Sequence, residues 1–237
     1  MFNFKKAAKY IVFIGLFSIF SFAKAGSYED FFKAINLDDA RSVSALLQRG
    51  FDPNTVNPEG VPGLLLAIRS SSFKVAEVLA ASPEAKVDLR TLQDESPLML
   101  AALRGQLNLA SLLVARGAEI NKTGWTPLHY AATGGHVPVI ALLLDKKAAI
   151  NAESPNGSTP LMMASMYGSP EAVKHLIQAG ANLQVKNQLG LTALDFAQNA
   201  SRQNNIELLQ EGLRREAARQ SRNAANQPAA AASAQGR

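Results

Sequence analysis

Apolar and small residues recur along this chain in paired short blocks with the period of an α-helix. In the clearest pair, a first block covers 126–134 and a second block, richer in Val, Ile and Leu, covers 139–144. Thr126 is a suitable N-cap, because its hydroxyl can accept a hydrogen bond from an unpaired amide, and Pro127 suits the first helical position, where no N–H is needed. Gly135 ends the first block. The pattern predicts two short helices joined by a tight turn.

The same helix pair recurs along most of the chain. Its capping position falls at successive intervals of 34, 30, 33 and 33 residues, and a second apolar block follows each one, the positions being Pro62, Ser96, Thr126, Thr159 and Thr192. A further pair without a clear cap precedes them over 28–50. A single pair cannot bury its apolar face, so pairs at a regular interval must stack on one another. The spacing therefore predicts a repeat array.

One repeat carries a recognisable motif. Residues 126–131 read T-P-L-H-Y-A, and Gly135 and His136 follow. Motif and spacing together resemble the ankyrin repeat, whose signature is T-P-L-H-x-A. The resemblance implies an all-α fold, an ankyrin-repeat α-solenoid of about six helix-turn-helix repeats with short hairpin fingers. It covers roughly 28–212, and we place the repeat domain at 26–212.

Three repeats depart from the family pattern. Lys147 stands where the family has a left-handed Gly, which should cost about 1 kcal/mol. Pro62 offers no side-chain cap, so the first turn after it should be weaker by ~1 kcal/mol. Ser82 and Pro83 replace the Gly-containing turn that other repeats have. The connection 122–125 is three residues shorter than the usual finger.

The N-terminal 25 residues have the features of a secretory signal peptide. Three Lys residues lie within the first nine positions, an apolar stretch follows from Tyr10 to Phe22, and an A-x-A sequence ends at Ala25. The apolar stretch is shorter than the ~20 residues of a membrane span. We expect cleavage after Ala25. Because the exported chain resembles bacterial periplasmic ankyrin proteins, we expect a periplasmic location; an uncleaved anchor is the alternative.

Charge and cysteine content narrow the function classes. The formal net charge of +5 includes four Lys in residues 1–25, which contain no acidic residue, so the remaining chain has a net charge of +1. This balance gives no support to nucleic-acid binding by the folded part. The chain has no Cys, which excludes a lipoprotein attachment site, a disulfide framework and a thiolate metal site.

The C-terminal segment 213–237 is basic and rich in Ala and Gln. Such a composition cannot bury enough apolar surface to offset the entropy of ordering, so we expect a disordered tail. A solubilising role is the simplest interpretation. Tethering of the protein to a membrane or the cell envelope through residues 217–237 is the alternative.

The sequence shows no catalytic motif. A nucleophile elbow, a phosphate-binding loop and a zinc-protease motif are all absent. The family resemblance implies structural roles for His129 and His136. We therefore expect no enzyme, no cofactor and no metal. The alternative is a cryptic metal or catalytic site formed by stacking, which would need His136, His175 and a carboxylate within ligand distance.

The resemblance also indicates where a partner would bind. Ankyrin proteins commonly use their finger tips and the exposed, concave face of their first helices. At matching positions the candidate contact residues are Glu95, Leu103, Arg104, Trp125, Thr133, Ser158, Met166, Tyr167 and Leu191. Aromatic residues and Arg dominate interface energetics, and we expect Arg104 and Glu95 to orient the partner. The alternative is that Trp125 and Tyr167 only pack on neighbouring repeats.

We therefore expect a monomeric, non-catalytic module that binds a periplasmic protein, with no nucleic-acid partner and no stable membrane insertion after signal cleavage. Two narrower readings remain open. The protein could stabilise a periplasmic enzyme such as catalase, to which some exported bacterial ankyrin proteins look linked, or it could be an immunity protein for a toxin.

Overall fold

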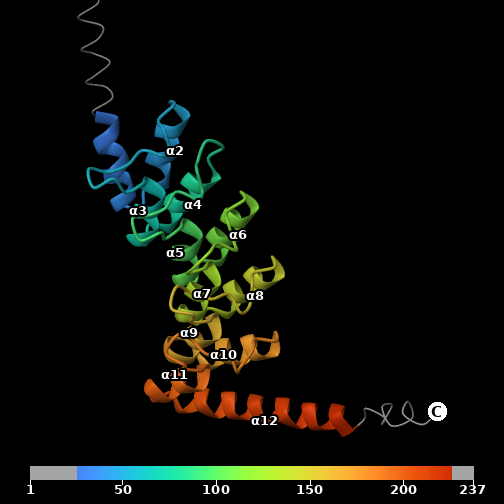
Figure 1. The fold of residues 1–237 in the computed structure, drawn as a ribbon. Helices are drawn as coiled ribbons and strands as arrows, with labels where there is room; N and C mark the ends of the chain where they lie inside the picture. Colours follow the sequence, from blue (N-terminus) through green and yellow to red (C-terminus); the bar gives the residue numbers. More distant parts are fainter. Residues whose placement is uncertain (1–25, 226–237) are drawn as a thin grey trace, which may run out of the picture. The chain divides into compact units, whose positions relative to one another are not determined.

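The computed structural model describes residues 26–225, which form six consecutive helix pairs (Figure 1). Their order is a helix over 26–36, α2 (Ala40–Gln48), α3 (Gly63–Arg69), α4 (Phe73–Ala81), α5 (Pro97–Leu103), α6 (Leu107–Ala115), α7 (Pro127–Gly134), α8 (Val137–Asp145), α9 (Pro160–Tyr167), α10 (Pro170–Gln178), α11 (Ala193–Asn199) and α12 (Gln203–Ala225). The residues described contain no β-strand, only an isolated bridge between Val56 and Pro62. The all-α repeat fold is confirmed.

The predicted signal peptide lies outside the described residues. Among residues 26–225, no helix combines the length and the apolar character that crossing a membrane requires.

The chain divides into two compact units. Among the described residues, unit 1 comprises 26–100 and Ser111–Ala118, and unit 2 comprises Ala101–Ala110 and 119–225. The division passes through α5 and α6, so each of these helices contributes residues to both units.

Unit 1 is built on the first two helix pairs. Phe31 and Ile35 from the first helix are fully buried, as are Leu65 of α3 and Leu79 of α4. The turn between the first helix and α2 contains Asp39, whose carboxylate caps α2 by accepting hydrogen bonds from two backbone amides. This terminal repeat keeps its aromatic core although its first helix lacks the family cap.

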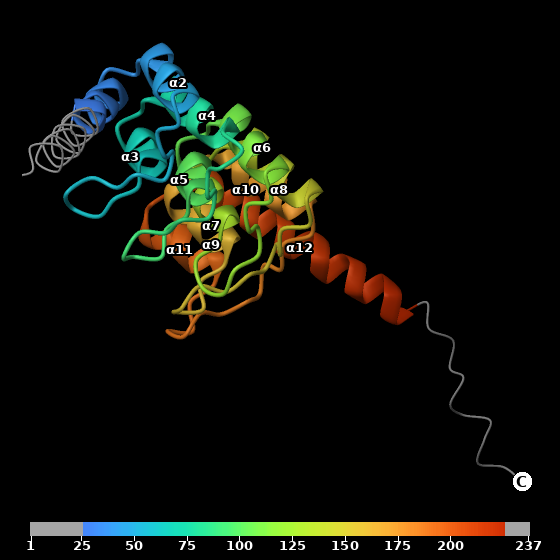
Figure 2. The same cartoon turned by 90° about the horizontal axis from the view of Figure 1, so that it is seen from above.

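Unit 2 has two layers of helices. The first helices α7, α9 and α11 contact one another in that order, and the second helices α8, α10 and α12 form the other layer (Figures 1 and 2). The core between the layers consists of fully buried aliphatic side chains, among them Leu128, Ile140, Leu143, Val173 and Leu176. This packing fixes the register of the first helices, on which the candidate surface lies.

The last helix is longer than expected. The sequence predicts a disordered tail over 213–237, but α12 continues to Ala225 and its second half extends past α10 and α11 (Figures 1 and 2). Ala, Arg, Gln and Glu have high helix propensity, and Glu211 pairs with Arg215 one turn later at 2.7 Å. These local preferences hold the exposed half of the helix without tertiary burial. The rest of the predicted tail, 226–237, lies outside the described residues.

Two departures from the family pattern have visible consequences. Lys147 adopts the left-handed conformation predicted for it, with φ +65°. After α4, where a turn glycine is missing, the guanidinium of Arg116 donates hydrogen bonds to the carbonyls of Ala80, Ser82 and Pro83 at 2.8, 2.6 and 3.0 Å. Arg116 thereby satisfies the free carbonyls at the end of α4.

Candidate partner-binding surface

The first helices of unit 2 start at capping boxes, which fix where each helix begins. In each box the third helical residue accepts a hydrogen bond from the backbone N–H of the N-cap threonine. The acceptors are His129 Nδ1 at 3.1 Å from Thr126, Met162 Sδ at 3.3 Å from Thr159 and Asp195 Oδ2 at 2.7 Å from Thr192. Three chemically different side chains therefore accept the same backbone hydrogen bond. Because each helix starts at the same repeat position, the residues before the caps occupy equivalent positions in successive repeats.

The residues that directly precede these caps form the finger row, which we define as Trp125, Ser158 and Leu191. All three belong to the predicted binding residues. Trp125 and Leu191 are half-buried, whereas the side chain of Ser158 is only 1% exposed. Ser158 is therefore not accessible to a partner, and this part of the prediction is wrong.

Ser158 is buried at the contact with the preceding repeat, where His129 of α7 forms a hydrogen bond to its backbone. Its carbonyl lies 2.9 Å from His129 Nε2, and its N–H donates to Ser154 Oγ at 3.0 Å. The Ser158 hydroxyl has no hydrogen-bond partner among the described residues. The sequence position alone could not show this, because the burial comes from the stacking of α7 on α9.

Trp125 combines packing with exposure. Its ring meets the imidazole of His129 edge to face at a centroid distance of 5.2 Å, and its carbonyl accepts a hydrogen bond from Lys122 Nζ at 3.1 Å. The ring nevertheless stays half-buried. Trp125 is thus held in a defined orientation with part of its face open, which suits a binding residue better than a mobile side chain would.

The second set lies at the other end of the first helices. We define the helix-end row as Leu103, Arg104, Thr133, Met166 and Tyr167. Arg104 and Tyr167 are exposed, Tyr167 by 52%, and the other three are half-buried. Trp125 and Thr133 are eight positions apart and most of this interval is helix, which corresponds to about 12 Å at 1.5 Å per residue. The predicted residues of unit 2 therefore lie in two rows and not in one cluster.

Side chains from the following repeats fix the backbone of the helix-end row. His136 Nε2 lies 3.0 Å from the Leu103 carbonyl, to which it donates. Arg202 donates from Nε to the Met166 carbonyl at 3.1 Å and from Nη2 to the Tyr167 carbonyl at 3.3 Å. These bonds satisfy carbonyls at helix ends and keep the row rigid.

Between the two rows lie three large side chains that sequence reasoning missed. Tyr130, Met163 and Phe196 occupy the fourth position of α7, α9 and α11, at intervals of 33 residues, and each is half-buried. The signal was present in the sequence, because a bulky apolar residue recurs at one repeat position. We call these three residues together with the finger row and the helix-end row the unit 2 face.

Glu95 is the one predicted contact residue that belongs to unit 1. Its carboxylate pairs with the Arg69 guanidinium at 2.8 Å, and its side chain is 21% exposed. Arg104 belongs to unit 2. Glu95 thus forms an ion pair within unit 1, just before α5. The unit 2 face does not include it.

His129 is a buried residue of the capping box of α7. Burial lowers the pKa of His129 to about 4, so the ring is neutral at ordinary pH and serves as a hydrogen-bonding residue. Among residues 26–225, no group of three or more His, Asp or Glu side chains could hold a metal ion. The alternative of a metal site built from His136 and His175 therefore gains no support from the stacking.

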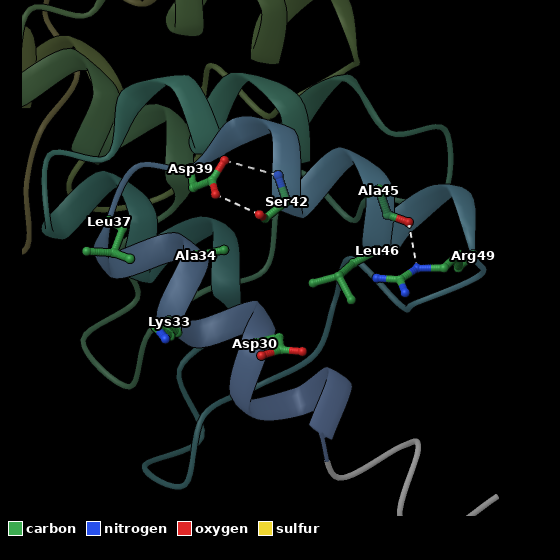
Figure 3. A pocket seen from close by; sticks show the side chains of 9 residues that line it. All are labelled: Asp30, Lys33, Ala34, Leu37, Asp39, Ser42, Ala45, Leu46 and Arg49. Atoms are coloured by element: carbon green, nitrogen blue, oxygen red, sulfur yellow. Dashed lines mark hydrogen bonds between the residues drawn. The ribbon is translucent and has the colours of Figure 1, made fainter.

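A groove of about 390 Å³ lies in unit 1 between the first helix and α2 (Figure 3). It mixes two acidic, two basic and several apolar side chains, the charged ones being Asp30, Lys33, Asp39 and Arg49. The Asp39 carboxylate is committed to α2, because it accepts hydrogen bonds from Ser42 Oγ at 2.6 Å and from the Ser42 amide, which lower its pKa. Such a carboxylate is a helix cap and not an acid catalyst.

Comparison with known proteins agrees with the repeat geometry. The family model described as ankyrin repeats, in three copies, matches the overlapping stretches 31–123, 64–154, 98–187 and 143–221. Among similar proteins, the ankyrin repeat and SAM domain-containing protein 6 of Rattus norvegicus is 30% identical over 142 residues, which are 58% of this chain and 16% of that protein.

Two further relatives show the same partial coverage. The SH3 and multiple ankyrin repeat domains protein 2 of Homo sapiens is 33% identical over 158 residues, 64% of this chain and 8% of that protein. The nuclear factor NF-kappa-B p105 subunit of Gallus gallus is 29% identical over 161 residues, 65% of this chain and 16% of that protein. The matched region thus makes up less than a fifth of each of the three relatives.

Proposed function

Because this chain belongs to the ankyrin-repeat family, we propose that it is a non-catalytic module that binds a partner protein through the unit 2 face. Ankyrin repeats indicate a protein–protein interaction module, and the choice of surface is our own. One observation carries it: large apolar side chains recur at equivalent positions of α7, α9 and α11 and remain half-buried or exposed in the folded unit.

The energetics of such a face are those of an aromatic interface. Trp125, Tyr130, Tyr167 and Phe196 keep apolar area open to solvent on a rigid support of capped helices. A partner that covers this area gains roughly 25 cal/mol per Å² of apolar surface removed from water. Little backbone entropy is lost on binding, because hydrogen bonds already order the backbone of both rows.

The partner that we propose is a periplasmic protein. Support comes from the N-terminal sequence pattern, which is that of an export signal with cleavage after Ala25. Stabilisation of an enzyme such as catalase and immunity against a toxin are two forms of this proposal that differ only in the partner. Fractionation of the source cells by osmotic shock, followed by N-terminal sequencing, should give a soluble protein that begins at Gly26.

Site-specific photo-crosslinking in the source cells tests the binding face. A photoreactive phenylalanine analogue replaces Tyr167 in one variant and Lys174, which is exposed on the second helix α10, in the control. We expect one discrete adduct from position 167 and none from position 174. The same adduct from both positions, or none from either, contradicts the proposed face.

A second comparison uses matched removal of apolar area. The double variant Trp125→Ala, Tyr167→Ala should lose the partner identified by crosslinking, whereas Leu37→Ala, Leu92→Ala removes two exposed leucines of unit 1 and should retain it. Circular dichroism confirms that both variants are folded. Equal retention of the partner by both double variants would overturn the assignment.

A further inference from the structure

A groove in unit 2 lies between the chain that follows α10 and the helix α12. Two adjoining hollows of about 550 and 510 Å³ share Asn182, Glu216 and Arg219. Ile177 and Leu183 line the larger hollow, and residues of the extended half of α12 line both. We call this the C-terminal groove.

In the preceding repeats, an asparagine side chain at the equivalent position forms hydrogen bonds with the backbone of the next repeat. Asn121 donates from Nδ2 to the carbonyl of Lys147 and accepts from the amide of Ala149, both at 2.8 Å. One repeat later, Asn151 accepts from the amide of Asn182 at 2.9 Å. Each asparagine thus bonds to the backbone of the turn in the next repeat. We call this series of side chain–backbone hydrogen bonds the ladder.

The ladder ends at Gln184, which occupies the corresponding position of the last finger. Gln184 meets no backbone turn in the sixth repeat, because α12 continues as a helix to Ala225, and its Nε2 instead donates to Glu216 of α12 at 3.4 Å. Its Oε1 atom accepts no hydrogen bond from the described residues and is free to receive a backbone N–H. The groove therefore has an open position for one more stretch of polypeptide backbone.

The arginines of the groove indicate that the bound polypeptide would be acidic. Arg215 and Arg219 line the groove one helical turn apart and point along the same side of α12. Arg215 is paired with Glu211, whereas Arg219 makes no ion pair within residues 26–225. Glu216 is held by Gln184. The groove thus offers a guanidinium that can bind a carboxylate in bidentate fashion.

We propose that the C-terminal groove binds an extended acidic segment of a partner protein, whose backbone continues the ladder beyond Gln184 and whose carboxylates pair with Arg219, while Arg215 adds positive charge beside its ion pair with Glu211. A lipid surface fits less well. The far side of this half of α12 carries Arg214, Ser221 and Arg222, and its apolar groups are the methyl groups of alanines such as Ala217 and Ala218, which is too little apolar area for a helix that lies in a membrane interface.

The experiment measures fluorescence anisotropy of a labelled peptide of alternating Glu and Val, with the purified full-length chain, at low and at physiological ionic strength. The comparison peptide has Gln in place of every Glu. We expect saturable binding of the acidic peptide and binding weaker by about tenfold for the Gln peptide. Absence of saturable binding of the acidic peptide overturns the proposal.

Matched variants of α12 separate the groove from general attraction between opposite charges. Arg215→Glu, Arg219→Glu changes two arginines that line the groove, and Arg214→Glu, Arg222→Glu makes the same charge change at two that do not. We expect a loss of about tenfold or more for the first pair and less than about threefold for the second. Equal losses mean unspecific attraction of anions and overturn the proposal.

Two further readouts complete the test. Gln184→Ala keeps the charge of the groove, so a loss of several-fold in peptide affinity supports the backbone contact, and an unchanged affinity contradicts it. Vesicles with anionic headgroups and single-stranded DNA serve as competitors. Displacement of the peptide from the wild type by either one, at equal concentration of negative charge, would assign the groove to another class of ligand. The helicity of every variant is checked by circular dichroism.

Discussion

The Nδ1 atom of His129 lies 3.1 Å from the backbone nitrogen of Thr126 and accepts its hydrogen. The proton of the neutral ring is therefore on Nε2, which donates to the carbonyl of Ser158 at 2.9 Å. One buried imidazole thus satisfies the N-terminus of α7 and ties it to the residue before the cap of α9. Protonation would remove the lone pair of Nδ1 and break the bond to Thr126.

Stability should depend on pH through His129. Burial, the largest cause, lowers its pKa to about 4 in the folded chain, against 6.5 as the ordinary value. Between these values the unfolded chain binds more protons, so stability falls as the pH decreases from about 6.5 to about 4. The full effect is about 3 kcal/mol by linkage. Urea unfolding from pH 7.5 to 4.5 measures most of it, above the range where the lowered carboxylates Asp39 and Asp195 protonate, while Glu211, whose ordinary pKa is 4.5, begins to contribute at the lower end.

The control comes from the protein itself, because Met162 fills the same capping position in the next repeat. His129→Met should therefore fold and should lose most of the decrease in stability between pH 6.5 and 4.5, while His136 and His175 remain. An unchanged pH profile in this variant would show that another group causes the loss.

Backbone strain at Lys147 gives a second prediction. Lys147 has φ +65°, whereas the equivalent turn residues Gly117 and Gly180 have φ +86° and +93°. Lys147→Gly should raise the free energy of unfolding by about 1 kcal/mol, since glycine adopts this conformation without steric cost. Gly117→Ala should lower it by a similar amount, although a methyl group there meets no atom within 4 Å. Two changes of the same sign would exclude backbone conformation as the cause.

Local signals made much of this fold predictable. Most repeats carry a capping Ser or Thr and several carry a proline at the first helical position, and these signals recur at a nearly constant interval. The six helix pairs and the strained turn at Lys147 could therefore be predicted from the sequence. The burial of Ser158 could not, because it depends on the stacking of α7 against α9. The length of α12 was missed for another reason: helix propensity outweighed the lack of apolar bulk.

The binding face could be predicted only in part, because the burial of its residues also depends on how the repeats stack. Trp125 and Tyr167 were identified from their repeat positions, and both keep exposed area. Their separation by the length of a helix follows from the positions, yet only the folded unit shows the residues between them, such as Tyr130 and Met163. Whether such a residue is buried depends on side chains about 33 positions away, and a single repeat does not contain that information.

Arg116 gives a third prediction. Its guanidinium stabilises the turn after α4, where other repeats have a glycine. It donates to three carbonyls that follow or end the helix, those of Ala80, Ser82 and Pro83. Arg116→Ala should lower the free energy of unfolding by about 2 kcal/mol, since carbonyls near the surface lose a charged donor. Arg116→Lys should recover only part of this loss, because an ammonium group cannot match the planar fork. Arg41→Ala, at an exposed position of α2, is the control.

Gly63 at the start of α3 gives the last prediction. A Cβ atom at this position would lie 2.8 Å from the ring of Phe31, which is fully buried and packed against Phe51. Gly63→Ala should therefore destabilise unit 1 by about 1–2 kcal/mol, although alanine favours helix, because the ring has little room to move. Gly26→Ala, with no atom within 4 Å, should be neutral or slightly stabilising.

A double-mutant cycle identifies the contact responsible for the loss at Gly63. Phe31→Leu removes the ring atoms that the new methyl group would meet, so the loss from Gly63→Ala should shrink when both changes are present. Urea unfolding of the four proteins gives the interaction energy. Strict additivity would mean that the ring does not limit the size of residue 63, and the requirement for glycine would then lie in the backbone at the start of α3.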